Sequence, residues 1–259
     1  MRFVTLTSDW NKDDYYTGAV KGRILSSCEE AEIVTLSSRV KPFGISEAAM
    51  IVRNSSNHFP PGTVHLIAVG TDPEPGCAML AAGIDDHFYI TADNGILGLL
   101  GDAEKTEVVQ LDPPGDQAAA SFPELTIFCK AACSLLNGTP LSKLGKPVEN
   151  FKKQIPLRAT LENNTITGTV IYIDSYGNAI TNISRELFDR IGKDRKFSIY
   201  VQSKHYRITK INRHYSETSA GDLLAVFNSI NLLEIAIRSG SAKDLLNLDT
   251  DSTVRVEFN

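Results

Sequence analysis

Short apolar runs alternate with amphipathic runs through the first half of the chain. The apolar runs are typical of β-strands, and the amphipathic runs have helical spacing. We expect strands at 2–8, 33–36, 64–69 and 87–91, helices at 14–26, 45–54 and 125–136, and a turn or helix at 94–100. Because strands and helices alternate, this half predicts an α/β domain. The apolar run 64–69 favours a mainly parallel sheet that is covered on both faces.

The pattern changes after about Lys146. A stretch with several prolines and polar residues follows, and beyond it short β-like segments recur between Gly, Asn and Ser residues. These segments lie at 169–173, 197–202, 205–211, 223–227, 234–237 and 253–258. Short strands at regular spacing are typical of a small barrel or sandwich. The sequence therefore predicts an α/β domain at 1–146, a linker at 147–166 and an all-β barrel domain at 167–259.

The charge balance limits the possible partners. Lys and Arg total 26 and Asp and Glu total 31, so the formal net charge is −5. A nucleic-acid binder needs clustered Lys and Arg, which this chain lacks, so we expect no nucleic-acid partner. The sequence contains no apolar run of about 18 residues, and we expect no membrane span. The hydrophobic share of 42% predicts a folded core. We expect a cytoplasmic protein.

Cysteine and histidine residues give little support for a metal site. Cys129 and Cys133 lie one helical turn apart in an apolar run, so they could form a metal-binding pair or pack in a core. Because no His or second Cys pair has zinc-like spacing, we favour core packing and expect no metal. His65 lies within an apolar strand, and we interpret it as a core or interface histidine.

Acidic residues follow the first predicted strand. Asp9 ends that strand, and Asp14 opens the helix after it. In an open α/β sheet, ligands bind beyond the carboxyl ends of the strands, so both acids are candidates for binding ribose hydroxyls or an ammonium group. Asp14 could instead act as a helix cap.

Two further polar loops are candidates. Residues 174–178 contain Asp174, Tyr176 and Asn178 around a glycine, and Asn94 lies in a strand-to-turn corner at 91–95. An asparagine amide can both donate to and accept from a purine edge. Each loop could also be an ordinary turn.

Several short motifs follow one another from residue 3 to about 245. They include Thr5-Leu6-Thr7-Ser8-Asp9-Trp10, Asp14-Tyr15-Tyr16, Gly62-Thr63-Val64-His65-Leu66, Asp93-Asn94-Gly95-Ile96-Leu97, Tyr176-Gly177-Asn178 and Asn228-Ser229. Each motif is weak alone, but the ordered set is specific. In this set the chain resembles, as a divergent member, the S-adenosylmethionine hydroxide adenosyltransferase family. That family comprises S-adenosylmethionine hydrolases and also includes the fluorinase and chlorinase enzymes.

The resemblance implies an α/β domain followed by a β-barrel. It also implies a homotrimer that binds its nucleoside substrate between the barrel of one subunit and the α/β domain of its neighbour. Several side chains would surround the substrate. Asp9 would hold the ribose hydroxyls, Phe43 would pack on the ribose side, Asn178 would read the adenine, Asp14, Tyr16, Asp174 and Ser229 would surround the methionine end, and Asn94, Tyr176 and Phe227 would be further lining. S-adenosylmethionine would be the substrate, with no cofactor.

The implied reaction is attack of water at C5′ of S-adenosylmethionine, giving adenosine and L-methionine. The family's hydrolases activate this water with an Asp, an Arg and a His. Counted from His65, the Asp position falls on Gly70, and a shift of two residues places Asp72 there. No Arg follows before residue 145, and Pro123 replaces the His. We therefore expect Asp72 to be the catalytic base, unless it only forms an Asp-Pro turn.

Three interpretations follow from these replacements. The protein could be a hydrolase with a rebuilt water site. It could bind S-adenosylmethionine or adenosine without turnover. It could also be a related adenosyltransferase that uses another nucleophile.

Overall fold

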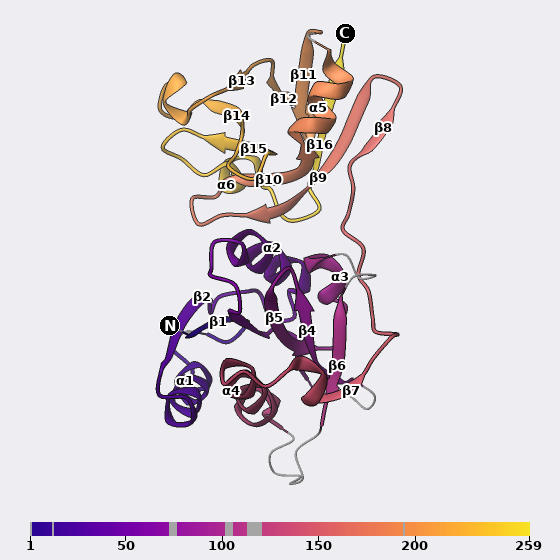
Figure 1. The fold of residues 1–259 in the computed structure, drawn as a ribbon. Helices are drawn as coiled ribbons and strands as arrows, with labels where there is room; N and C mark the ends of the chain where they lie inside the picture. Colours follow the sequence, from indigo (N-terminus) through magenta and orange to yellow (C-terminus); the bar gives the residue numbers. More distant parts are fainter. Residues whose placement is uncertain (1, 12, 73–76, 102–105, 113–120, 194) are drawn as a thin grey trace. The chain divides into compact units, whose positions relative to one another are not determined.

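The chain divides into two units, residues 1–155 and residues 156–259. The computed structural model describes residues 2–11, 13–72, 77–101, 106–112, 121–193 and 195–259 (Figure 1). Within these ranges, no helix is long and apolar enough to cross a lipid bilayer.

A mixed β-sheet forms the centre of the N-terminal unit. Its strand order is β2-β1-β3-β5-β4-β6-β7. The strands are β1 (Arg2–Ser8), β2 (Ala31–Ser37), β3 (Val64–Ala68), β4 (Met79–Ile84), β5 (His87–Ala92), β6 (Glu107–Leu111) and β7 (Gly145–Pro147). Strands β2, β1, β3 and β5 pair in parallel, whereas β5, β4, β6 and β7 pair antiparallel. The α/β class is confirmed, but the prediction of a mainly parallel sheet was wrong.

A hairpin between β4 and β5 causes this change of direction. The two strands pair from Met79 opposite Ala92 to Ile84 opposite His87. The connecting residues Asp85 and Asp86 have positive φ angles of 47° and 64°. Positive φ at both central residues is typical of a two-residue type I′ turn, which joins antiparallel strands directly. The sequence did not indicate β4, because its Met-Leu-Ala-Ala-Gly-Ile run has one β-branched residue and no aromatic residue.

Helices cover both faces of this sheet (Figure 1). α1 (Tyr15–Ser27) and α4 (Cys129–Leu136) pack on one face, and a π-helical turn, η2 (Glu124–Phe128), leads into α4. α2 (Ile45–Ser56) and α3 (Leu97–Leu100) pack on the other. Along β3, Leu66 joins the core under α1 and α4, and Ile67 joins the core under α2. Successive strand side chains point to opposite faces, so an apolar run is needed here. A short 3₁₀ helix, η3 (Leu141–Lys143), precedes β7.

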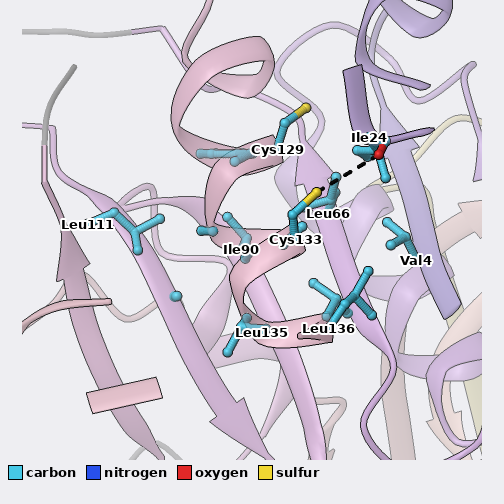
Figure 2. Packing of buried hydrophobic residues seen from close by; sticks show 14 of the residues in the cluster. Val4, Ile24, Leu66, Ile90, Leu111, Cys129, Cys133, Leu135 and Leu136 are labelled. Carbon is cyan, nitrogen blue, oxygen red and sulfur yellow. Dashed lines mark hydrogen bonds between the residues drawn. The ribbon is translucent and has the colours of Figure 1, made fainter. Parts of the chain in front are cut away.

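The cysteines of α4 pack in the core between this helix and α1. Figure 2 shows Cys133 pointing toward Ile24, and its thiol lies 4.0 Å from the carbonyl oxygen of that residue. The Cys129 thiol donates in the same way to the carbonyl of Val20, at 3.7 Å. Burial raises the pKa of Cys129 to about 12 and that of Cys133 to about 11. Both are therefore neutral packing residues, as the core interpretation expects.

A curved sheet, antiparallel except for the parallel pair β13 and β14, makes up most of the C-terminal unit. Its order is β12-β11-β16-β9-β10-β15-β14-β13, and β8 also pairs with β9. The strands are β8 (Thr160–Glu162), β9 (Thr165–Ile173), β10 (Ala179–Ser184), β11 (Phe197–Val201), β12 (Ser203–Ile208), β13 (Ile211–Asn212), β14 (Leu223–Phe227), β15 (Leu232–Ile237) and β16 (Thr253–Phe258). β12 contacts β14 near the other end of the sheet, so the sheet is nearly closed. A barrel-like C-terminal sheet is thereby confirmed, and β8 lies inside the segment predicted as a linker.

Three short helices connect strands of this unit. They are α5 (Arg185–Gly192), α6 (Ala242–Leu246) and the 3₁₀ helix η4 (Tyr215–Glu217). The hydroxyls of Ser184 and Ser241 accept hydrogen bonds from the amides of Leu187 and Asp244, each at 3.1 Å. These N-caps satisfy amides that have no partner within the helix, so they fix where α5 and α6 begin.

His65 forms a buried polar chain across the N-terminal sheet. Its Nδ1 lies 2.7 Å from the Thr5 hydroxyl, and its Nε2 lies 3.2 Å from Nδ1 of His87. The Tyr89 ring stacks on it, with ring centroids 4.8 Å apart. Burial, followed by the neighbouring His87, lowers the pKa of His65 to about 3. This residue is thus a neutral core histidine, as the sequence predicts.

We predict that His65 makes stability sensitive to acid. Below the ordinary histidine pKa of 6.5 the unfolded chain binds a proton that the folded chain excludes until pH about 3. The free energy of unfolding should therefore fall by up to about 1.4 kcal/mol per pH unit between these limits because of this group. In His65→Gln, urea unfolding at pH 6.5 to 4.5 should show a correspondingly shallower slope. The exposed control His205→Gln should keep the wild-type slope; equal slopes in all three proteins would contradict the prediction.

Candidate active site

A cavity of about 290 Å³ lies at the carboxyl ends of β1 and β3. Its wall is formed by residues that follow these strands, by residues 42–43 and by residues 121–124 before α4. Four of the side chains predicted from the sequence line it: Asp9, Tyr16, Phe43 and Asp72. This is the edge of an open α/β sheet at which ligands bind.

Asp9 connects loops that follow three neighbouring strands. Its Oδ2 atom accepts hydrogen bonds from the backbone amides of Phe43, at 2.9 Å, and Gly70, at 3.2 Å. Both donors have left-handed backbones, with φ of 62° and 56°. A Cβ atom on Gly70 would lie 3.0 Å from the Ile45 side chain, so glycine suits both the turn and the packing. One carboxylate therefore fixes the loop geometry on this side of the cavity.

Aromatic rings form a second part of the wall. The Trp10 centroid lies 5.7 Å from that of Tyr16 and 5.6 Å from that of Phe122, and Tyr16 and Phe122 are 5.2 Å apart. The Phe43 ring, also in the wall, is 66% exposed. Aromatic faces attract cations, and carboxylates in the same cavity add to this attraction. The lining therefore suits a ligand that has both a positive charge and flat apolar groups.

Glu124 is a cavity residue that the sequence reasoning missed. It is only 4% exposed, and the Thr71 hydroxyl donates a hydrogen bond to its Oε1 atom. Burial raises the pKa of Glu124; the Thr71 hydrogen bond opposes this shift, and the carboxylates of Asp9 and Asp72 add to it. The signal in the sequence is an acidic residue directly after Pro123, which stands where the family has its His. Asp72, in contrast, is exposed.

Asp14 and Asn94 are not among the residues that line the cavity. Asp14 occupies the N-cap position of α1 without a side-chain capping bond, and it accepts a hydrogen bond from the Asn11 amide at 3.1 Å. The Asn94 amide donates to the carbonyls of Val69, at 2.9 Å, and Gly70, at 3.2 Å. Asn94 therefore supports the turn after β3 from outside the cavity.

The predicted turn of the barrel unit joins β9 to β10. Asp174 Oδ1 accepts the amides of Tyr176 and Asn178, both at 2.9 Å, and Oδ2 accepts the Asn178 side-chain amide at 3.0 Å. Gly177 has a φ of 78°, and a Cβ atom there would lie 2.1 Å from the Ser241 hydroxyl. The turn is thus internally bonded and packed against Ser241, while the Tyr176 side chain is 78% exposed. Ser241 also lines an open hollow of about 530 Å³. The other lining residues are Gly221, Ile237, Gly240, Asp244 and Leu245.

The remaining predicted residues lie at the end of β14. The Arg185 guanidinium is 4.5 Å from the centroid of the Phe227 ring, and Phe188 packs against that ring at 5.3 Å. Ser229 is exposed in the turn after β14. The Asn228 side chain accepts the amides of Ile230 and Leu232 at 3.2 and 3.1 Å, which shapes this turn.

Metal-binding chemistry gains no support from the side chains. Among the described residues, no grouping of His, Cys, Asp or Glu could hold a metal ion.

The chain belongs to the S-adenosylmethionine hydroxide adenosyltransferase family. The family's N-terminal domain model matches residues 4–145, and its C-terminal domain model matches residues 168–255. An (R)-S-adenosyl-L-methionine hydrolase of Thermus thermophilus is 30% identical over 99% of this chain and 100% of its own. A fluorinase of Actinopolyspora mzabensis is 22% identical, covering 98% and 96%.

A solved structure agrees with this fold. An uncharacterized conserved protein from Thermotoga maritima matches with a TM-score of 0.84, covering 98% of this chain and 99% of its own, at 23% identity. At this identity the similarity concerns the fold alone.

We predict that Asp9→Ala destabilises the N-terminal unit. The substitution leaves two backbone amides without their carboxylate acceptor, so the free energy of unfolding should fall by about 1–3 kcal/mol. Asp9→Asn keeps an acceptor oxygen and should lose less. Chemical denaturation followed by tryptophan fluorescence measures both, because Trp10 is the single tryptophan of the chain. The exposed control Asp13→Ala should change stability by less than about 0.5 kcal/mol; an equal loss in both alanine variants would refute this role.

Proposed function

We propose that the protein transfers the adenosyl group of S-adenosylmethionine to water, giving adenosine and L-methionine. The observation that carries the proposal is the cavity in the N-terminal unit, which combines aromatic rings with the carboxylates of Asp9, Asp72 and Glu124. S-adenosylmethionine has a sulfonium cation and a flat purine, so it matches both kinds of lining. Family membership over both domains supports the same substrate.

The chemistry places its main demand on the nucleophile. The sulfonium leaves as a neutral thioether, so no acid is needed to expel it. Water must lie in line behind C5′, and such positioning can contribute about 7–11 kcal/mol. Removal of a proton from that water by a well-placed base adds about 10²–10⁴ in rate. Asp72 and Glu124 are the candidates for this base among the described residues of the cavity wall.

Substrate-binding roles are part of the proposal. Asp9 would hold the ribose hydroxyls with Phe43 beside them, and Tyr16 would contact the methionine end. Asp14, Asp174 and Ser229 would also surround the methionine end, and Asn178 would read the adenine. Asn94, Tyr176 and Phe227 would be further lining. The bonded Asp174–Asn178 turn supports a preorganised amide, because its orientation is fixed before a purine arrives.

A homotrimer with its sites at subunit interfaces is also part of the proposal. We expect a mass of about three times 28.3 kDa by light scattering. If each site uses two subunits, refolding a mixture of Asp9→Asn and Asn178→Ala chains should restore part of the activity that each variant lacks alone. A monomeric mass, or a mixture no more active than its components, would contradict this assembly.

We predict that incubation with S-adenosylmethionine releases adenosine and methionine in equal amounts. In water enriched in ¹⁸O, the label should enter the 5′-hydroxyl of adenosine, because water forms the new C5′–O bond. Chromatography with mass spectrometry measures both results. Intact substrate together with calorimetric binding would favour a binding protein without turnover. A different 5′-substituted adenosine would favour an adenosyltransferase that uses another nucleophile.

A further inference from the structure

We propose that Glu124, rather than Asp72, is the general base that takes the proton from the attacking water. This inference rests on the proposed hydrolase function and assigns a residue to its central step. It follows from the position of a buried carboxylate in the cavity wall, its hydroxyl partner and the helix that carries it.

The Glu124 carboxylate is held in one orientation. Thr71 donates its hydroxyl proton to Oε1, and Thr71 is itself 9% exposed, so the pair lies away from bulk water. Both side chains line the cavity. With Oε1 held by Thr71, we assign Oε2 as the oxygen that contacts the water. A fixed, poorly solvated carboxylate accepts a proton with less reorganisation than a mobile, hydrated one.

The backbone under Glu124 is also constrained. Pro123 precedes it, and Glu124 is the first residue of the π-helical turn η2. The Cys129 amide donates to the Glu124 carbonyl, and Phe128 at the end of the turn is fully buried. Single π-helical turns within helices occur frequently at functional sites. This turn places a glutamate at the start of the helix, next to the cavity.

The electrostatic surroundings favour Glu124 as a base at neutral pH. Burial raises its pKa most, and the carboxylates of Asp9 and Asp72 raise it further, against the lowering effect of the Thr71 hydrogen bond. A base with a pKa closer to the working pH takes a proton more effectively. Tyr16 from α1 is the other titratable side chain in this wall among the described residues. Asp72 is exposed, so water competes for its carboxylate.

The step balances without a further reactant. The water oxygen forms a bond to C5′ while the C5′–S bond breaks, and that electron pair neutralises the sulfonium. One water proton passes to Glu124 as the bond forms. Adenosine and methionine leave, and Glu124 then releases its proton to solvent.

The test compares Glu124→Gln with wild type in adenosine release. We expect kcat to fall by about 10²–10⁴ with KM changed by less than about threefold, because the amide keeps the shape but accepts no proton. Glu107→Gln is the matched control: Glu107 is an exposed strand residue outside the cavity wall, and its substitution should leave kcat unchanged. Calorimetric binding of S-adenosylmethionine by Glu124→Gln shows that the variant is folded.

A second variant tests the mechanism by pH. The wild-type kcat should fall on the acid side as Glu124 becomes protonated, at a pH above the ordinary glutamate range. Thr71→Val removes the bond that lowers the Glu124 pKa, so this limb should move to higher pH, and Thr71→Ser should restore it. A purely structural threonine would lower stability without moving the limb.

The outcomes separate the two proposals. No adenosine from wild type overturns the proposed function and this inference with it. Wild-type turnover that Glu124→Gln retains overturns the assignment of Glu124 alone. In that case, a large loss of kcat in Asp72→Asn would assign the base to Asp72.

Discussion

The shape of the cavity depends on one carboxylate oxygen, Oδ2 of Asp9, which accepts hydrogen bonds from two backbone amides. Asp9 follows β1, Phe43 lies in the segment after β2, and Gly70 follows β3, so the Asp9 carboxylate joins the ends of three adjacent parallel strands. Backbone amides in such loops need partners, and a charged acceptor is a strong one. The Asn94 side-chain amide supports the same turn by donating a hydrogen bond to the Gly70 carbonyl. The Asp9 carboxylate therefore holds the loops after β2 and β3 together on one side of the cavity.

Three carboxylates in one small cavity create an electrostatic demand that a cation satisfies. Burial raises the pKa of Glu124 most, and the carboxylates of Asp9 and Asp72 raise it further, so a negative charge on Glu124 is costly. A sulfonium ligand would offset this repulsion, and the rings of Trp10, Tyr16 and Phe122 would contribute cation–π attraction. The lining of the cavity therefore favours a cationic substrate.

Local patterns predicted many elements but not the direction of the sheet. The strand predicted at 2–8 is β1, and the helix predicted at 45–54 agrees closely with α2, because each has a clear apolar period. β4 was missed because alanine and glycine are weak β-formers, and its hairpin with β5 makes the sheet mixed. β10 was not predicted, because its Ala-Ile-Thr-Asn-Ile-Ser run includes alanine and asparagine, which are depleted in strands.

The sequence by itself predicted that Asp9 lies at the ligand-binding edge of the sheet, because it follows the first strand. The family resemblance implied that Tyr16, Phe43 and Asp72 lie around the same substrate, and all four side chains line one cavity. The sequence also indicated the family through ordered motifs, which need no contact information. The tertiary structure decided that Glu124 is buried beside Thr71, although 53 positions separate them along the chain. The pKa of a carboxylate depends on its burial and on hydrogen bonds to residues far away in the sequence, and local sequence patterns do not predict either. The sequence therefore gives the residue type, whereas the folded surroundings determine how readily it takes up a proton.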